Sequence, residues 1–82
     1  MDAAIVDLEN RLKNAKRFLN TELSGLKTGR DNTRFSRAEV DRHLDTIHET
    51  ERTGFRQINE MQEIKIERML TSVESVMSLH KN

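Results

Sequence analysis

Histidine and carboxylate side chains are the first candidates for chemistry in this sequence. Asp45 and His48 lie three residues apart, a spacing at which one helix of a four-helix bundle presents a carboxylate and an imidazole to a metal ion. No bridging carboxylates align with them on the preceding helical pattern, and His43 and His80 have no companions at ligand spacing. We therefore interpret Asp45 and His48 as part of a solvated helix face and expect no metal site.

Nucleophile and cofactor motifs are also missing from the sequence. The serines have no paired base in a turn, and the three glycines form no phosphate-binding loop. Because there is no cysteine, a disulfide framework and a thiolate zinc site are both excluded. We expect a protein that is not an enzyme and that uses no cofactor and no small-molecule substrate.

Composition favours long helices in one small domain, residues 1–82. Charged and apolar residues each make up 34% of the chain, there is no proline, and the 14 basic residues balance the 14 acidic ones. A core of this size is marginal without oligomerisation. No run approaches the roughly 18 apolar residues of a membrane span, and the N-terminus resembles neither a secretory signal nor a transit peptide. We expect a soluble, intracellular location, either cytoplasmic or inside a virion.

The first helix is predicted over residues 2–28. Asp2 is a suitable N-cap, and Gly29 can take the left-handed conformation that ends a helix. Between them, apolar residues recur every three or four positions and form one continuous stripe. The stripe consists of Ile5, Leu8, Leu12, Ala15, Leu19, Leu23 and Leu26.

A second helix is predicted from residue 36 to about residue 80, after a turn over 29–35. Ser36 and Glu39 form the sequence pattern of a capping box, while Phe35 and Val40 occupy the positions of a hydrophobic staple. So short a turn makes the two helices antiparallel. Only Gly54 interrupts the second pattern, so the sequence allows one long helix or two helices broken near residue 54.

Two polar residues, Glu51 and Gln62, fall inside the apolar stripe of the second helix. Polar residues at such positions can fix the register or the oligomeric state of a coiled coil. Alternatively, a slightly rotated helix keeps both at the boundary of the core, with Ile47, Ile58 and Met61 forming the seam.

The last part of the chain carries more apolar residues than the first helix can cover. Beyond about residue 63 these are Ile64, Ile66, Met69, Leu70, Val73, Val76, Met77 and Leu79. Leaving such side chains in water is unfavourable by about 1.5 to 3 kcal/mol each. We therefore predict a homo-oligomer, a coiled coil or helical bundle, built on a two-fold contact. Its predicted interface is Ile66, Met69, Leu70, Val73, Val76 and Met77.

Basic residues gather around the predicted turn although the net charge is zero. This basic tip is formed by Lys27, Arg30, Arg34 and Arg37. Such a cluster can hold phosphate, either that of a nucleic acid or that of a membrane head group, although it has no interleaved aromatic residues for base stacking. The other interpretation is a solvated tip with local ion pairs.

The stretches 7–12, DLENRL, and 21–32, TELSGLKTGRDN, resemble the first helix of ribosome recycling factors, which ends in a similar Thr-Gly-Arg-x-Asn sequence. Arg52 and Arg56 are similar to the arginines of that family's second helix. The resemblance implies a helical domain that binds ribosomal RNA. The family's inserted β-rich domain and its third helix are not expected here. The stretch 35–45, FSRAEVDRHLD, is similar to the helix entry of bacterial division coiled-coil proteins of the DivIVA type.

Together these patterns predict an all-α antiparallel hairpin that acts as a non-enzymatic assembly module. Its expected partners are copies of itself and another protein. The alternative is an RNA- or ribosome-binding protein that uses the basic tip.

Overall fold

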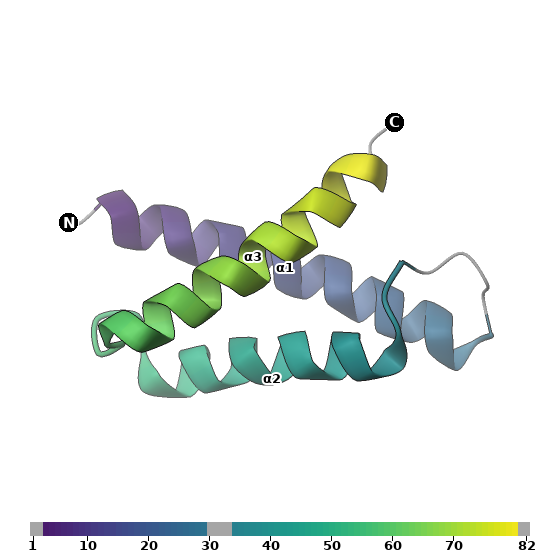
Figure 1. Cartoon of the computed structure of the whole chain (residues 1–82), viewed down its shortest axis with the longest axis horizontal. Coiled ribbons are helices and arrows are strands. Elements are labelled where there is room, and N and C mark those ends of the chain that lie inside the picture. The colour runs from purple at the N-terminus through teal and green to yellow at the C-terminus, as the bar shows by residue number, and fades with distance from the viewer. Residues whose placement is uncertain (1–2, 30–33, 81–82) are drawn as a thin grey trace.

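The computed structural model describes residues 3–29 and 34–80, and over these ranges it contains three helices. They are α1 (Ala3–Lys27), α2 (Arg37–Thr53) and α3 (Glu60–His80). In Figure 1, α2 runs antiparallel to α1, and α3 turns back from the end of α2 and crosses α1. Each helix contacts the other two, in a molecule of 41 × 25 × 16 Å. The predicted all-α class is confirmed.

The first helix closely follows its predicted range. Its stripe faces the core, because Leu8, Leu12, Ala15 and Leu19 are buried. Gly29 has φ +78°, the left-handed conformation predicted for the residue that ends this helix. The predicted cap, Asp2, lies outside the described residues.

The start of α2 is also as predicted. The Glu39 N–H donates to Ser36 Oγ at 3.2 Å, and the Ser36 N–H donates to Glu39 Oε1 at 3.0 Å. The bond from the Ser36 N–H, followed by the bond with the Ser36 side chain, lowers the pKa of Glu39. Phe35 and Val40 are both buried in the core, as the hydrophobic staple requires.

Gly54 divides the segment that the sequence left as one helix or two. Its φ of +88° is incompatible with a right-handed helix, and α2 therefore ends at Thr53. The Gly54 N–H still donates to the Thr50 carbonyl oxygen at 2.8 Å, which closes the last turn. The chain then reverses over residues 54–59. Of the two alternatives, the chain takes two helices broken near residue 54, and the hairpin with one long second helix is corrected to three helices.

A second capping box, which was not predicted from the sequence, starts α3. The Asn59 N–H donates to Gln62 Oε1 and the Gln62 N–H donates to Asn59 Oδ1, both at 2.8 Å. Asn followed three residues later by Gln is a recognisable helix-start pattern. Gln62 is therefore not a polar position of a coiled-coil seam, because its side chain caps a helix.

The core lies where the three helices meet, and α3 contributes about a third of it. Ile66, Met69, Leu70 and Val73 are buried there, and Val76 and Met77 pack against them with part of their surface exposed. The prediction that this half of the chain lacks a covering partner is therefore wrong, since α3 folds back onto α1 and α2. None of the described helices is both long enough and apolar enough to cross a membrane.

Candidate interaction surface on the third helix

Two large apolar side chains remain exposed next to each other near the start of α3. Met61 is 80% exposed and Ile64 is 52% exposed. The prediction that Met61 lies in the seam is wrong. Met61 precedes buried Ile66 by five residues, which places it about 140° around the helix from Ile66 and so away from the core. Met61, Ile64, Arg68 and Thr71 together are called the outer face of α3 below.

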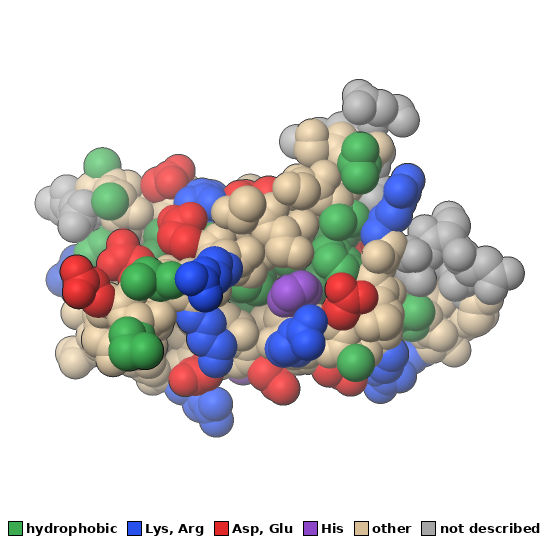
Figure 2. Space-filling view, in the orientation of Figure 1, with side chains coloured by type: hydrophobic (Ala, Val, Ile, Leu, Met, Phe, Trp, Pro, Cys, Tyr) green, Lys and Arg blue, Asp and Glu red, His purple; other side chains and the backbone are tan. Residues whose placement is uncertain are grey.

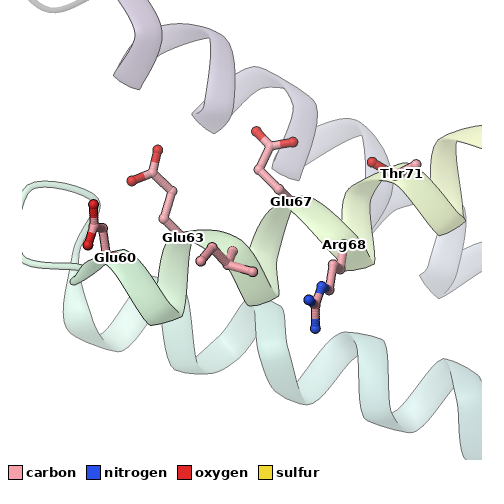
Figure 3. A pocket seen from close by; sticks show the side chains of 6 residues that line it. Glu60, Glu63, Glu67, Arg68 and Thr71 are labelled. Atoms are coloured by element: carbon pink, nitrogen blue, oxygen red, sulfur yellow. The ribbon is translucent and has the colours of Figure 1, made fainter.

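Opposite charges flank this outer face. Glu60, Glu63 and Glu67 extend from one side of α3, and Arg68 points away from them toward α2 (Figure 3). Lys65 lies on the same side as Arg68, next to α2, where it pairs with a carboxylate of that helix. Two open hollows of about 710 and 600 Å³ share the side chains of Ile64 and Arg68. In Figure 2, hydrophobic side chains lie among acidic and basic ones at this end of the molecule. The outer face therefore presents a small apolar patch, Met61 and Ile64, between an acidic edge (Glu60, Glu63 and Glu67) and a basic edge (Lys65, toward which Arg68 also points).

A guanidinium from α1 holds α3 at its acidic edge. Arg11 donates through Nε and Nη2 to the two carboxylate oxygens of Glu74, at 3.0 and 2.8 Å, and through Nη1 to Glu67 at 2.9 Å. The bond to Glu74, then the bond to Glu67, raises the pKa of Arg11, and the same bond lowers the pKa of Glu74. This clamp was not predicted from the sequence, although Glu67 and Glu74 are two helical turns apart and so share one side of α3.

Two further ion pairs connect the helices at the surface. Lys16 Nζ lies 2.9 Å from Glu51 Oε2, between α1 and α2, and Lys65 Nζ lies 3.7 Å from Glu49 Oε2, between α2 and α3. Glu51 is exposed, which agrees with the interpretation that it sits at the boundary of the core.

The predicted oligomer interface and the surface that is actually exposed do not coincide. Four of the six predicted interface residues are buried inside the chain, whereas Ile64 and Leu79, at 52% and 57% exposure, face solvent. Self-association therefore stays a prediction, and on the folded chain the outer face of α3 is where two exposed apolar residues, Met61 and Ile64, lie together.

The basic tip is described only in part. Lys27, Arg34 and Arg37 are exposed around the turn between α1 and α2, and Arg30 lies outside the described residues. Arg37 Nε is 3.4 Å from Asp41 Oδ2, an ion pair along α2. The Arg34 backbone N–H donates to the carboxylate of buried Glu22 at 3.3 Å, which attaches the end of the turn to α1.

The histidines do not assemble a metal centre in the part of the chain that is described. Asp45 and His48 are both exposed, as a solvated helix face requires, and no described group of three His, Asp or Glu residues is placed to hold a metal ion. His43 is half-buried against the ring of Phe35, with centroids 5.4 Å apart. Burial, followed by the charge of Arg42, lowers the pKa of His43, and Glu39 opposes this shift.

Comparison with known protein families, with curated proteins and with solved structures finds no match to this chain.

Proposed function

We propose that this chain is a non-enzymatic helical assembly module that associates with copies of itself through the outer face of α3. The observation that carries this proposal is the exposure of Met61 and Ile64 side by side on one helix. Contiguous apolar surface with a polar rim is typical of protein interaction sites.

The arrangement of charge supports a second copy as the partner and indicates its orientation. When two identical helices pack face to face in parallel, the acidic edge of one meets the basic edge of the other. An antiparallel pair instead brings acidic edge against acidic edge. Lys65 follows Glu60 by five residues, which is the separation between a g position and the next e position of a parallel coiled coil. With Glu60 at g, Met61 and Ile64 take the central a and d positions.

The contact predicted in this way is small. Arg68 and Thr71 follow at the next a and d positions, so the apolar seam extends over a single heptad. We therefore expect weak, concentration-dependent association rather than an obligate dimer.

Sedimentation equilibrium from micromolar to millimolar concentration tests this function. The mass of the wild type should rise with concentration, and Ile64→Glu should reduce that rise while the chain stays folded, because Ile64 is half-exposed. Val6→Glu is the matched control, since Val6 is an exposed apolar residue on α1. A wild type that stays monomeric throughout, or an Ile64→Glu variant that associates normally, would contradict the proposal.

A charge exchange tests the parallel orientation. Glu60→Lys and Lys65→Glu should each weaken association, and the double variant should restore it. Because the natural chain has no cysteine, Thr71→Cys gives a further readout. Parallel pairing brings the two introduced thiols together and allows a disulfide, whereas antiparallel pairing about Ile64 keeps them apart.

The basic tip supports a second candidate function, binding of RNA. Lys27 and Arg34 are exposed and make no ion pair with a described residue, so their charges are available to phosphate. The resemblance of residues 21–32 to ribosome recycling factors makes ribosomal RNA the favoured target. Filter binding at two salt concentrations tests this, because phosphate contacts produce a steep salt dependence. Replacing Arg30, Arg34 and Arg37 by Gln should abolish binding, and Ile64→Glu should leave it unchanged.

A further inference from the structure

The turn between α2 and α3 interrupts a segment whose sequence is otherwise compatible with one helix. Residues 37–80 contain no proline and one glycine, and the break depends on two local features. One is the φ of +88° at Gly54, and the other is the reciprocal pair of hydrogen bonds between Asn59 and Gln62. Phe55 and Ile58, the apolar residues of this turn, are only partly buried.

Among the described residues, the helix contacts and the ion pairs of α3 reach α1 and α2. The core contacts of Ile66, Leu70 and Val73 are with those helices. The ion pairs of α3 also reach them, through Arg11 and Glu49. An identical α1–α2 pair in a second copy offers the same surface to α3. Exchange of identical elements between copies conserves all of these contacts and changes only the connection.

We propose that two copies of this chain exchange α3. Residues 54–59 straighten, α2 and α3 become one helix about 66 Å long, and each α3 packs on the α1–α2 pair of the other copy. The geometry of the closed chain allows this directly. Because α2 and α3 are antiparallel neighbours, two opened chains related by a two-fold axis through residues 54–59 place each α2 along the partner's α3.

The centre of the exchanged dimer gains a contact that the closed chain lacks. Phe55 and Ile58 lie next to the two-fold axis, where each approaches its own symmetry mate. These side chains keep part of their surface exposed in the closed chain. The exchange also accounts for the long helix and the oligomer interface that the sequence pattern predicts, since Ile66, Met69 and Leu70 then join two chains. It does not depend on the proposed function, because Met61 and Ile64 face outward in both forms.

Replacing Gly54 by a residue that disfavours a positive φ tests the exchange. In Gly54→Ala the added Cβ has room, since the nearest atom is Gln57 Cγ at 4.0 Å. The positive φ is nevertheless unfavourable for an L-residue, and a straight helix relieves it. We expect the dimerisation constant to rise about a hundredfold, because the dimer relieves this conformation in both of its chains, and to rise further when Asn59→Ala also removes the cap. Gly29→Ala is the matched control: it adds the same Cβ at the other glycine of positive φ, +78°, with no atom within 4 Å, and should leave dimerisation unchanged.

Two cysteines distinguish this dimer from one formed through the outer face of α3. One copy carries Glu49→Cys and the other Lys65→Cys, at positions whose side chains form an ion pair at 3.7 Å in the closed chain. When the two copies are unfolded and refolded together, exchange brings these thiols together on different chains, so an interchain disulfide should form. Spin labels on both positions of one chain are close together in the closed form. In the exchanged dimer they should lie about 24 Å apart, the length of sixteen helical residues.

The Ile64→Glu background completes the test. The interchain disulfide should persist there, whereas association through the outer face is lost. The inference is overturned if Gly54→Ala and the double variant stay monomeric while their helix content matches that of the wild type. It is equally overturned if dimers of these variants, made with cysteine at position 49 of one copy and at position 65 of the other, form no interchain disulfide. If Gly54→Ala does not fold, Asn59→Ala alone decides, because a dimer fraction no higher than that of the wild type contradicts the proposal.

Discussion

The two turns of this molecule reverse the chain with similar local devices but are anchored very differently. Each ends in a capping box, Ser36–Glu39 in the first and Asn59–Gln62 in the second. In the first turn, Phe35 is buried between Phe18 on α1 and His43 on α2, with ring centroids 6.5 and 5.4 Å away.

The second turn has no comparable anchor. Its apolar residues, Phe55 and Ile58, keep part of their surface in solvent, and its direction depends on the backbone of Gly54. The comparison shows that a cap decides where a helix begins, whereas a buried side chain decides whether the reversal is held. The second turn is therefore the place where this fold can open.

The largest expected effect separates the two anchors. Phe35→Ala should lower the free energy of unfolding by about 3 kcal/mol or more, because it empties a fully packed site. Phe55→Ala should cost clearly less, since Phe55 is only partly buried. Urea denaturation followed by circular dichroism measures both. If Phe35→Ala does not fold, Phe35→Leu provides the comparison, and equal losses at positions 35 and 55 would remove the distinction between the turns.

The two caps should have equal local effects and unequal consequences for assembly. Ser36→Ala and Asn59→Ala should each lower the unfolding free energy of the monomer by about 1 kcal/mol. Only Asn59→Ala should also increase the dimer fraction, because only that cap opposes a continuous helix. Thermal melting at several protein concentrations measures both quantities. A dimer fraction raised by Ser36→Ala would contradict the assignment of the hinge.

A smaller effect should follow from the histidine that packs against the first turn. Because the folded protein lowers the pKa of His43, the unfolded chain binds more protons near and below the ordinary histidine pKa of about 6.5. Stability should therefore be complete above that pH and decline as the pH falls through the folded pKa. His43→Gln should show less of this decline between pH 7 and 5. An identical decline in the variant would show that other groups cause it.

The smallest effect is expected at the surface of the first turn. Arg34→Gln and Arg37→Gln should each change the unfolding free energy by less than about 0.5 kcal/mol, because both side chains are exposed. Urea titration of the double variant measures this. A large loss would mean that the basic tip is part of the anchor around Phe35 and not a free surface.

Local patterns predicted the elements of this fold whose causes are themselves local. The first helix, its end at Gly29 and the Ser36 capping box all depend on residues within a few positions of one another. The Asn59–Gln62 box has the same local cause and was readable in principle, but the apolar stripe around it favoured one long helix. Met61 was placed in the seam for the same reason.

The identity of the apolar residues determined that the second half of the chain had to be covered. Side chains such as Ile66, Leu70 and Val73 are unfavourable in water wherever they lie, and this requirement can be read from the sequence. What covers them depends on the path of the chain through residues 54–59. The sequence gives similar support to a bent and a straight path there, since a glycine adopts both signs of φ.

Only the tertiary structure decided between these paths in the single chain. Folding back brings Arg11 to Glu67 and Glu74 and joins the apolar face of α3 to those of α1 and α2. These contacts connect residues more than fifty positions apart, so no local pattern could report them. By the same step, folding buried most of the predicted interface and left Met61 and Ile64 exposed, because the faces of a helix are assigned by what packs against it.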